Sequence, residues 1–465
     1  MVLQTYQDIT SPMTPSERYA TLSLAAIYAL RMLGLFMILP VLSLFSQQLE
    51  GATPQLIGLT MGIYGLPQVL LQIPFGLMSD RLGRKKVIIA GLLLFLAGSI
   101  VAALSTSIEG VLVGRALQGA GAISSAVMAL VADLTQEVHR TKAMATIGVS
   151  IGMSFGAGLV AGPIVAGFGG LAAVFGFTAV LTVLAIVVLL VLVPNPKQSK
   201  RHRDAEFVPG QMLDALKNGE LLRLNYGIFV LHMVLMAIFV VVPTELRSSG
   251  LMPGNEWVVY LPVFSLGMVF AVPFIILAEK KRKMKPVFIG AIAVLLIAEI
   301  GLAGLHQQLA GIIACLGVFF CGFNLLEATL PSLVSKTAPA DLKGTAMGAY
   351  SSCQFFGLFL GGALGGWFKS HYGDASVFLF CAIALASWLL LSLTMKPPRY
   401  LANLLISIKG LNQTDNNAFS AEVLDIVGVE EMTLNTTDAV AYLKVDNQKL
   451  DSVSLQAVIS RYQLG

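Results

Sequence analysis

The chain has 465 residues, of which 56% are hydrophobic and only 12% are charged, and its mean hydropathy is +0.79. A soluble protein carries about twice that share of charged residues, so the composition excludes a soluble globular protein. The net charge of +4 is small, and the basic residues flank apolar segments rather than form a groove, which argues against nucleic-acid binding. We therefore expect a protein embedded in a lipid bilayer.

Twelve apolar segments follow one another, each long enough to cross a bilayer, which takes about 20 helical residues. Residues 1–20 are too polar for a cleavable signal peptide. Most Lys and Arg residues fall on one side of the membrane, and the positive-inside rule then places both termini in the cytoplasm. The predicted crossings lie near residues 21–47, 55–79, 85–107, 110–134, 141–168, 170–194, 222–247, 256–279, 285–306, 308–335, 342–370 and 374–396.

A charged run, GLMSDRLGRKK, joins the second and third segments. Gly76 permits close helix contact, and Arg84 can donate both to Asp80 and to Asp133 at the end of the fourth segment. Such a relay would act as a conformational latch that favours the state closed to the cytoplasm, whereas the alternative is a simple topology signal. The predicted latch residues are Gly76, Asp80, Arg81, Gly83, Arg84, Lys85 and Asp133.

The fifth segment is rich in glycine and holds one proline. These residues predict either a pliable hinge or a tight seam between two halves, and the alternative is ordinary packing of small residues in a membrane helix. The predicted hinge residues are Gly158, Gly162, Pro163 and Gly167.

A second run, PFIILAEKKRKMK at residues 273–285, repeats PFGLMSDRLGRKK at residues 74–86 and places Glu279 on Asp80. Further matches recur at an offset close to two hundred residues, so the chain consists of two six-helix halves. The predicted divisions are a cytoplasmic segment 1–20, the halves 21–194 and 222–396, a cytoplasmic connector 195–221 with an amphipathic helix, a linker 397–402 and a cytoplasmic domain 403–465.

The C-terminal region has the composition of a small soluble domain. Its pattern predicts a ferredoxin-like α+β sandwich, and it resembles heavy-metal-associated domains but lacks their cysteine pair, so we expect no metal. The four cysteines of the chain show no CxxC spacing. The predicted elements are strand 401–409, helix 418–427, strands 429–434 and 439–445, and helix 452–462.

Together these features resemble the major facilitator superfamily. Residues 76–86 are similar to its motif A, RALQGAG from Arg115 to Gly121 is similar to motif B, and the fifth segment is similar to motif C of its antiporters. The resemblance implies an all-α fold of twelve helices and a proton-driven transporter that alternates between inward-open and outward-open states. Lys336 aligns with Asp133, so we expect no equivalent relay in the second half.

Four ionisable residues lie inside the first, fourth, seventh and tenth segments, where a charge costs at least about 2.5 kcal/mol and usually faces a cavity or a partner. The resemblance implies that these helices line the central cavity. We interpret Glu327, His232 and Arg115 as proton-coupling residues, and Arg31 as the anchor of a substrate anion or a carboxylate. The alternatives are a snorkelling Arg115, a packing role for His232, and an Arg31 bound to carbonyls at a helix break.

Uncharged polar side chains are predicted to complete the cavity, which would then suit a lipophilic or amphiphilic substrate. Glu299, on the ninth segment, is expected at the periphery. The predicted cavity residues are Arg31, Gln68, Gln72, Gln118, Asn324 and Gln354.

The sequence favours a proton-coupled exporter, or antiporter, of small amphiphilic molecules in the bacterial inner membrane. No metal cluster, phosphate-binding loop or nucleophile motif appears, so we expect neither an enzyme nor a cofactor. Two alternatives remain: a membrane sensor or scaffold that binds ligand without turnover, and a facilitative uniporter. The tail is expected to bind a ligand, to dock on the transporter or to self-associate.

Overall fold

The structure is a computed structural model that describes residues 12–195, 217–252, 254–339, 342–397, 402–408, 411, 415–435, 440–446 and 449–462. Most of the predicted amphipathic helix in the connector lies outside the described residues, as does the greater part of residues 1–20.

The first half begins at a capping box. Thr14 accepts the amide of Glu17, and the Glu17 carboxylate accepts the amide of Thr14 at 2.8 Å, which fixes the start of the first helix. The helices of this half are α2 (Pro15–Met37), α3 (Leu39–Phe45), η1 (Ser46–Gln48), α4 (Pro54–Gly62), α5 (Gly65–Leu82), α6 (Arg84–Leu104), α7 (Ile108–Ala120), α8 (Ser124–Leu134) and α9 (Glu137–Val191).

The predicted first, second and fourth segments are each broken into shorter helices. Their helix ends leave backbone carbonyls without partners inside the helix, and such carbonyls need donors from elsewhere. The long run α9 is also interrupted, because the backbone at Gly169 and Gly170 is not helical.

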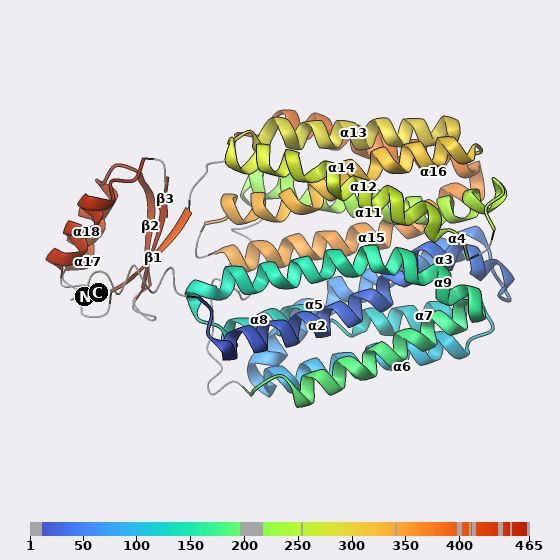
Figure 1. Cartoon of the computed structure of the whole chain (residues 1–465), viewed down its shortest axis with the longest axis horizontal. Helices are drawn as coiled ribbons and strands as arrows, with labels where there is room; N and C mark the ends of the chain where they lie inside the picture. Colours follow the sequence, from blue (N-terminus) through green and yellow to red (C-terminus); the bar gives the residue numbers. More distant parts are fainter. Residues whose placement is uncertain are drawn as a thin grey trace.

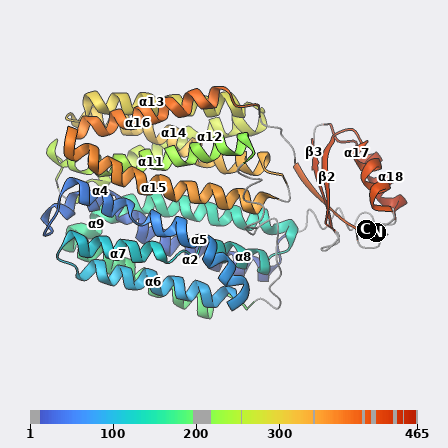
Figure 2. The same ribbon diagram turned by 180° about the vertical axis from the view of Figure 1, so that it is seen from behind.

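The second half repeats this plan with longer, uninterrupted helices. They are α11 (Gly219–Ser248), α12 (Trp257–Lys280), α13 (Met284–Leu305), α14 (Leu309–Thr337), α15 (Lys343–Tyr372) and α16 (Asp374–Leu393). In Figures 1 and 2 the helices of both halves run side by side along the long axis of the molecule, and the small C-terminal domain lies beyond one end of the bundle. We call this end the tail end and the opposite end the far end.

The described residues contain ten helical runs that are long and apolar enough to cross a membrane. One of them, Lys142–Val191, is long enough for two crossings and includes the break at Gly169 and Gly170. The helix α15 spans 30 residues but is not among the ten. The twelve-helix arrangement therefore stays a prediction.

The two halves pack most closely along α4 and α15. A side-chain carbon on Gly58 would overlap the backbone of Gly362 and Gly366, and one on Gly62 would overlap the carbonyl of Phe359. Only a residue without a side chain permits such an approach of two helix backbones.

Contacts at the far end also join the halves. Ser43 on α3 donates to the carbonyl of Phe239 on α11 at 3.0 Å, and the Arg247 guanidinium lies 5.7 Å from the centre of the Phe45 ring. At the far end the halves are therefore held together by contacts between α3 and α11.

Toward the tail end the halves diverge. Gly148, Gly152 and Gly156 lie one turn apart on one face of α9. Gly156 packs on the ring of Phe264 of α12, whereas a side-chain carbon at Gly148 or Gly152 would meet no atom within 4 Å. The contact of α9 with Phe264 of α12 at Gly156 is thus not continued at Gly152 and Gly148.

The C-terminal domain is a three-stranded antiparallel sheet with two helices on it. Its order is β1-β3-β2, with Ala441 paired to both Ile406 and Leu434, so β1 and β2 run parallel with β3 between them. This is a split β-α-β unit, the core of a ferredoxin-like sandwich; the complete sandwich stays a prediction. The elements are β1 (Ala402–Ser407), α17 (Asn416–Leu424), β2 (Val429–Asn435), β3 (Val440–Val445) and α18 (Ser452–Arg461).

Candidate functional site

The predicted latch residues of the first half come together at the tail end. Arg84 is 3% exposed and donates from Nε to Asp133 Oδ2 at 3.1 Å and from Nη1 to the Ser79 hydroxyl at 2.8 Å. Arg84 also forms an ion pair with Asp80. The arginine thereby ties the end of α5 to the end of α8, and Ser79 is a member that sequence reasoning missed.

The other predicted latch residues shape the turn between α5 and α6. Gly83 has φ of 99°, a conformation that favours glycine, and it ends α5 and begins α6. Gly76 faces Ser125 of α8, and Lys85 donates to the carbonyl of Val193 beyond α9. Arg81 is exposed.

All three charged members of the relay belong to the first half. Asp80 lies on α5, Arg84 on α6 and Asp133 on α8, so separation of the two halves does not require the relay to break. The relay therefore joins the ends of α5, α6 and α8 within one half, and its role as a conformational latch stays a prediction.

The second half carries a pair of reversed polarity. Lys336 of α14 forms an ion pair with Glu279 of α12, and Ser332 donates to the same carboxylate at 2.7 Å. The basic residue, Lys336, lies on α14, which is the counterpart of α8, the helix that carries the acidic Asp133 in the first half. The acidic residue, Glu279, lies near the end of α12, which is the counterpart of α5. The alignment of Lys336 with Asp133 contained this signal, although sequence reasoning expected no relay here.

A buried polar cluster in the first half centres on Tyr64. Its hydroxyl accepts from Arg31 at 2.9 Å and from Gln68 at 3.0 Å, and Arg31 also donates to the carbonyl of Gly121 at 2.9 Å. Gly121 follows the last residue of α7, and its carbonyl accepts the amide of Ile123 at 3.0 Å as well as Arg31, so the expected alternative of an arginine bound to a carbonyl at a helix break is present. Arg31 is 1% exposed, and its Nε and Nη1 groups have no hydrogen-bond partner in the structure.

Arg115 extends the same cluster toward the far end. It is 1% exposed and donates to Gln118 at 3.0 Å and to the carbonyl of Met61 at 3.2 Å, near the end of α4. Its guanidinium lies 5.1 Å from the centre of the Tyr64 ring. Gln118 in turn donates to Ser99 at 2.8 Å. Arg115 therefore binds inside the protein, which excludes the snorkelling alternative in this conformation.

A second polar cluster lies in the second half. His232 Nε2 is 2.7 Å from Gln354 Nε2 and 3.8 Å from Glu327 Oε2. The Glu327 side chain is 39% exposed, but its Oε2 atom is buried. Among the residues that the structure describes, neither Glu327 Oε2 nor His232 Nδ1 has a hydrogen-bond partner. Sequence reasoning placed these three side chains in one cavity, and the structure brings them into contact distance.

An aromatic contact beside the two clusters crosses the interface between the halves. The ring of Tyr64 lies 6.2 Å from that of Phe355, the neighbour of Gln354, and the ring of Phe323 lies 6.2 Å from that of His232. The basic cluster of the first half and the acidic cluster of the second thus lie on either side of the interface between the halves.

The remaining predicted residues are less directly placed. Gln72 is buried with an unpartnered side-chain oxygen, and Asn324 reaches the carbonyl of Phe264 at 3.5 Å, a long contact. The predicted hinge residues lie within α9 rather than at its break, where Gly158 and Gly162 pack against Phe36 and Met37 of α2 and Pro163 is an interior residue of the helix. A side-chain carbon on Gly167 would lie 4.0 Å from the Cα of Gly254 in the other half.

Glu299 is not at the periphery, and that expectation is wrong. It is fully buried on α13, and neither carboxylate oxygen has a hydrogen-bond partner. The helix turns it inward because the outward positions nearby are taken by Ile297 and Ile300, which are 64% and 56% exposed. The sequence alone does not determine which face of α13 turns toward the other helices.

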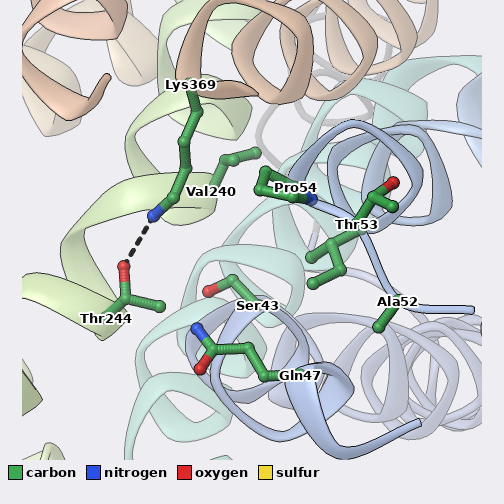
Figure 3. Close-up of a pocket in the computed structure, with 9 residues that line it drawn as sticks. Ser43, Gln47, Ala52, Thr53, Pro54, Val240, Thr244 and Lys369 are labelled. Carbon is green, nitrogen blue, oxygen red and sulfur yellow. Dashed lines mark hydrogen bonds between the residues drawn. The ribbon is translucent and has the colours of Figure 1, made fainter. Parts of the chain in front are cut away.

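A cavity of about 150 Å³ lies at the far end between the halves. Figure 3 shows Ser43 and Gln47 on one side and Lys369 and Thr244 on the other, with the lysine donating to the threonine hydroxyl at 2.8 Å. None of the predicted cavity residues lines it. Among the residues that the structure describes, no cluster of His, Cys, Asp and Glu has the arrangement of a metal site.

Comparison with known proteins identifies the fold and the relatives. The sequence profile of the Major Facilitator Superfamily matches residues 24–362. The inner membrane transport protein YajR of Escherichia coli (strain K12) is 45% identical over 447 residues, which cover 96% of this chain and 98% of that protein. The quinolone resistance protein NorA of Staphylococcus aureus (strain COL) is 23% identical over 369 residues, 76% of this chain and 91% of that one.

Among solved structures, a bacterial homolog of the human lysosomal transporter Spinster, in an inward-facing and occupied conformation, aligns with a TM-score of 0.68 at 14% identity. The alignment covers 82% of this chain and 97% of that one, and at this identity the likeness shows the fold alone.

Proposed function

Because the chain belongs to the Major Facilitator Superfamily, we propose that this multi-pass protein of the bacterial inner membrane exports small amphiphilic molecules in exchange for protons. The names of its relatives support this direction: one is an inner membrane transport protein and another is a quinolone resistance protein. Both termini, and with them the tail end of the bundle, would lie in the cytoplasm.

The observation that carries the proposal is the placement of Glu327 and His232 at 3.8 Å beside the interface between the halves. A carboxyl group in an apolar region is costly when charged and unpaired, whereas it becomes favourable when a protonated histidine or water faces it. Opening and closing of the halves changes that environment. Glu327 would therefore take up and release a proton as the transporter alternates, with His232 as its relay partner.

The first-half cluster would hold the polar part of the substrate. Arg31 keeps two donor groups without partners in a site that is 1% exposed, and Arg115 adds a second guanidinium. Phe155, Phe264 and Phe323 form an aromatic group at the interface between the halves, with the rings of Phe264 and Phe323 centred 5.5 and 5.8 Å from that of Phe155, and Phe323 lies against His232. A molecule with an apolar body and an anionic or hydrogen-bonding head would match this lining.

The first-half latch would hold the ends of α5, α6 and α8 together while the halves move. Because its three charged members share one half, it stiffens that half as a rigid body. We expect Asp80→Asn to loosen this half and thereby to change how it packs against the other half, which shifts the balance of inward-open and outward-open states without changing which substrates bind.

A thermal-shift screen against drug, sugar and lipid libraries would first identify a stabilising ligand. Transport of that ligand is then measured in proteoliposomes with and without an imposed pH gradient. We expect Glu327→Gln to abolish gradient-driven flux while ligand binding persists. Glu299→Gln is the matched control, because Glu299 is also an acid within an apolar helix of the second half but lies outside the site, and it should keep gradient-driven flux.

The alternatives predict other outcomes. A sensor or scaffold shows no gradient-driven flux even in the unmodified protein, and a facilitative uniporter shows flux that the pH gradient does not change. Equal coupling in Glu327→Gln and in the unmodified protein would remove Glu327 from the proposed proton path.

A further inference from the structure

The loop between α12 and α13 differs from its first-half counterpart at one position. In the aligned repeats, Arg282 stands where the first half has Gly83. Both residues have a positive φ, 99° for Gly83 and 54° for Arg282, and Arg282 is the non-glycine residue with this conformation among the described residues. A side chain disfavours this conformation, so the second half keeps an arginine where glycine would fit with less strain.

The Arg282 side chain leaves the bundle and binds the C-terminal domain. Its Nη2 donates to Asp446 Oδ1 at 2.5 Å and its Nη1 donates to Asp446 Oδ2 at 3.2 Å, a bidentate pair. Asp446 follows β3 and is held in place, because its amide donates to the carbonyl of Gly428 at 2.8 Å and its own carbonyl accepts from Lys449 and Leu450. These hydrogen bonds hold the backbone of Asp446 in place independently of its ion pair with Arg282.

A second contact joins the same domain to α14. Lys444 of β3 is 6% exposed and donates to the carbonyl of Ala338 at 2.9 Å. Ala338 caps the C-terminal end of α14, where a basic group is favoured by the free carbonyls of the last turn. The domain thus contacts the end of α14 and the loop after α12, and these are the two elements that the ion pair of Glu279 and Lys336 already joins.

We propose that the C-terminal domain is an intramolecular clasp on the second half, in which Asp446 gives the α12–α13 loop the carboxylate partner that Asp133 gives the loop of the first half. In the first half the acid comes from the neighbouring helix; in the second that position holds Lys336, and the tail supplies the acid. The domain moves with the second half as one body and stabilises the tail ends of α12 and α14. This inference rests on contacts at the tail end and not on the proposed proton path.

Hydrogen–deuterium exchange of the full-length protein tests the clasp without a substrate. In Asp446→Asn and in Arg282→Gly we expect exchange of amides in residues 281–287 and 336–339 to rise about ten-fold, which corresponds to about 1.4 kcal/mol of lost protection. Arg282→Gly also removes the backbone strain, so a rise in exchange in this variant is not explained by a damaged loop.

The control is Glu422→Gln, which breaks the ion pair of Glu422 with Arg461, 2.8 Å apart and wholly inside the C-terminal domain. It should leave exchange at the bundle unchanged. The charge reversal Arg282→Asp with Asp446→Arg should restore at least part of the protection lost in either single variant. Unchanged exchange of residues 281–287 in both Asp446→Asn and Arg282→Gly would overturn the clasp, whatever the outcome of the transport assays.

Discussion

The first-half latch permits a stability prediction for Arg84→Met. Arg84 is 3% exposed, and the side chain of Asp133 is fully buried. At the 3.1 Å that separates Arg84 Nε from Asp133 Oδ2, two unit charges attract by about 5 kcal/mol at an effective dielectric constant of about 20. Removal of the arginine leaves Asp133 in a buried site without this partner.

We expect Arg84→Met to lower the free energy of unfolding by about 3–5 kcal/mol, the usual cost of removing one member of a buried ion pair. The half-buried pair of Arg223 and Glu220, with side chains 28% and 25% exposed against 2% and 0% for Arg84 and Asp133, is the matched control. Loss of such a pair within one helix costs about 0.3–0.5 kcal/mol, so Arg223→Met should be nearly neutral.

Unfolding of the two variants and of the unmodified protein is compared in the same detergent by thermal and denaturant titration. The double variant Arg84→Met with Asp133→Leu replaces both charges by apolar groups and should recover much of the lost stability. If Arg84→Met costs no more than Arg223→Met, or if the double variant is less stable than Arg84→Met alone, the latch is not a buried electrostatic contact.

Two further predictions concern the interface between the halves and the C-terminal domain. Gly62→Val should prevent closure of the far end, because the valine side chain would overlap α15. A cysteine placed at Ile57 should then react faster with a membrane-impermeant thiol reagent. The control is Gly148→Ala, which places its methyl group in open space and should not change that rate. Asp451→Ala should lower the unfolding temperature of the C-terminal domain by a few degrees, because Asp451 caps α18 and accepts from Val453 and Ser454. The hydrogen bonds from Ser454 lower the pKa of Asp451 in the folded domain. The contribution of Asp451 to the stability of the domain is therefore present above the unfolded pKa of about 4 and is lost as the pH falls below that value. A difference in unfolding temperature between variant and unmodified protein that persists at lower pH would contradict this.

Much of the fold could be predicted from the sequence because a bilayer leaves few choices. Every backbone polar group in the hydrocarbon must bond within the protein, so long apolar segments form helices and charges gather at their ends. The repeat of residues 74–86 at 273–285 then indicates two related halves, and the pattern of the C-terminal region predicted strands and helices close to those observed. The breaks between α4 and α5 and between α7 and α8 were missed, because packing rather than composition stops these helices.

The candidate site was predictable in its members but not in its contacts. An ionisable residue in an apolar segment is visible in the sequence, and this singled out Arg31, Arg115, His232 and Glu327. That Arg31 donates to the carbonyl of Gly121 depends on a helix break that no local pattern marks. Tyr64 joins both arginines and escaped notice because a tyrosine in a membrane helix is unremarkable by composition.

The sequence by itself determined that this is a membrane-embedded protein of two related halves with a charged loop in each, because hydrophobic length and charge position are properties of the chain alone. Only the tertiary structure decided which charges meet. Glu279 pairs with Lys336, and Arg282 reaches across more than a hundred and sixty residues of sequence to Asp446. Such pairs form because helix packing brings distant chain segments within about 3 Å of each other, and ion pairing is governed by that distance and by burial, which a linear pattern does not contain.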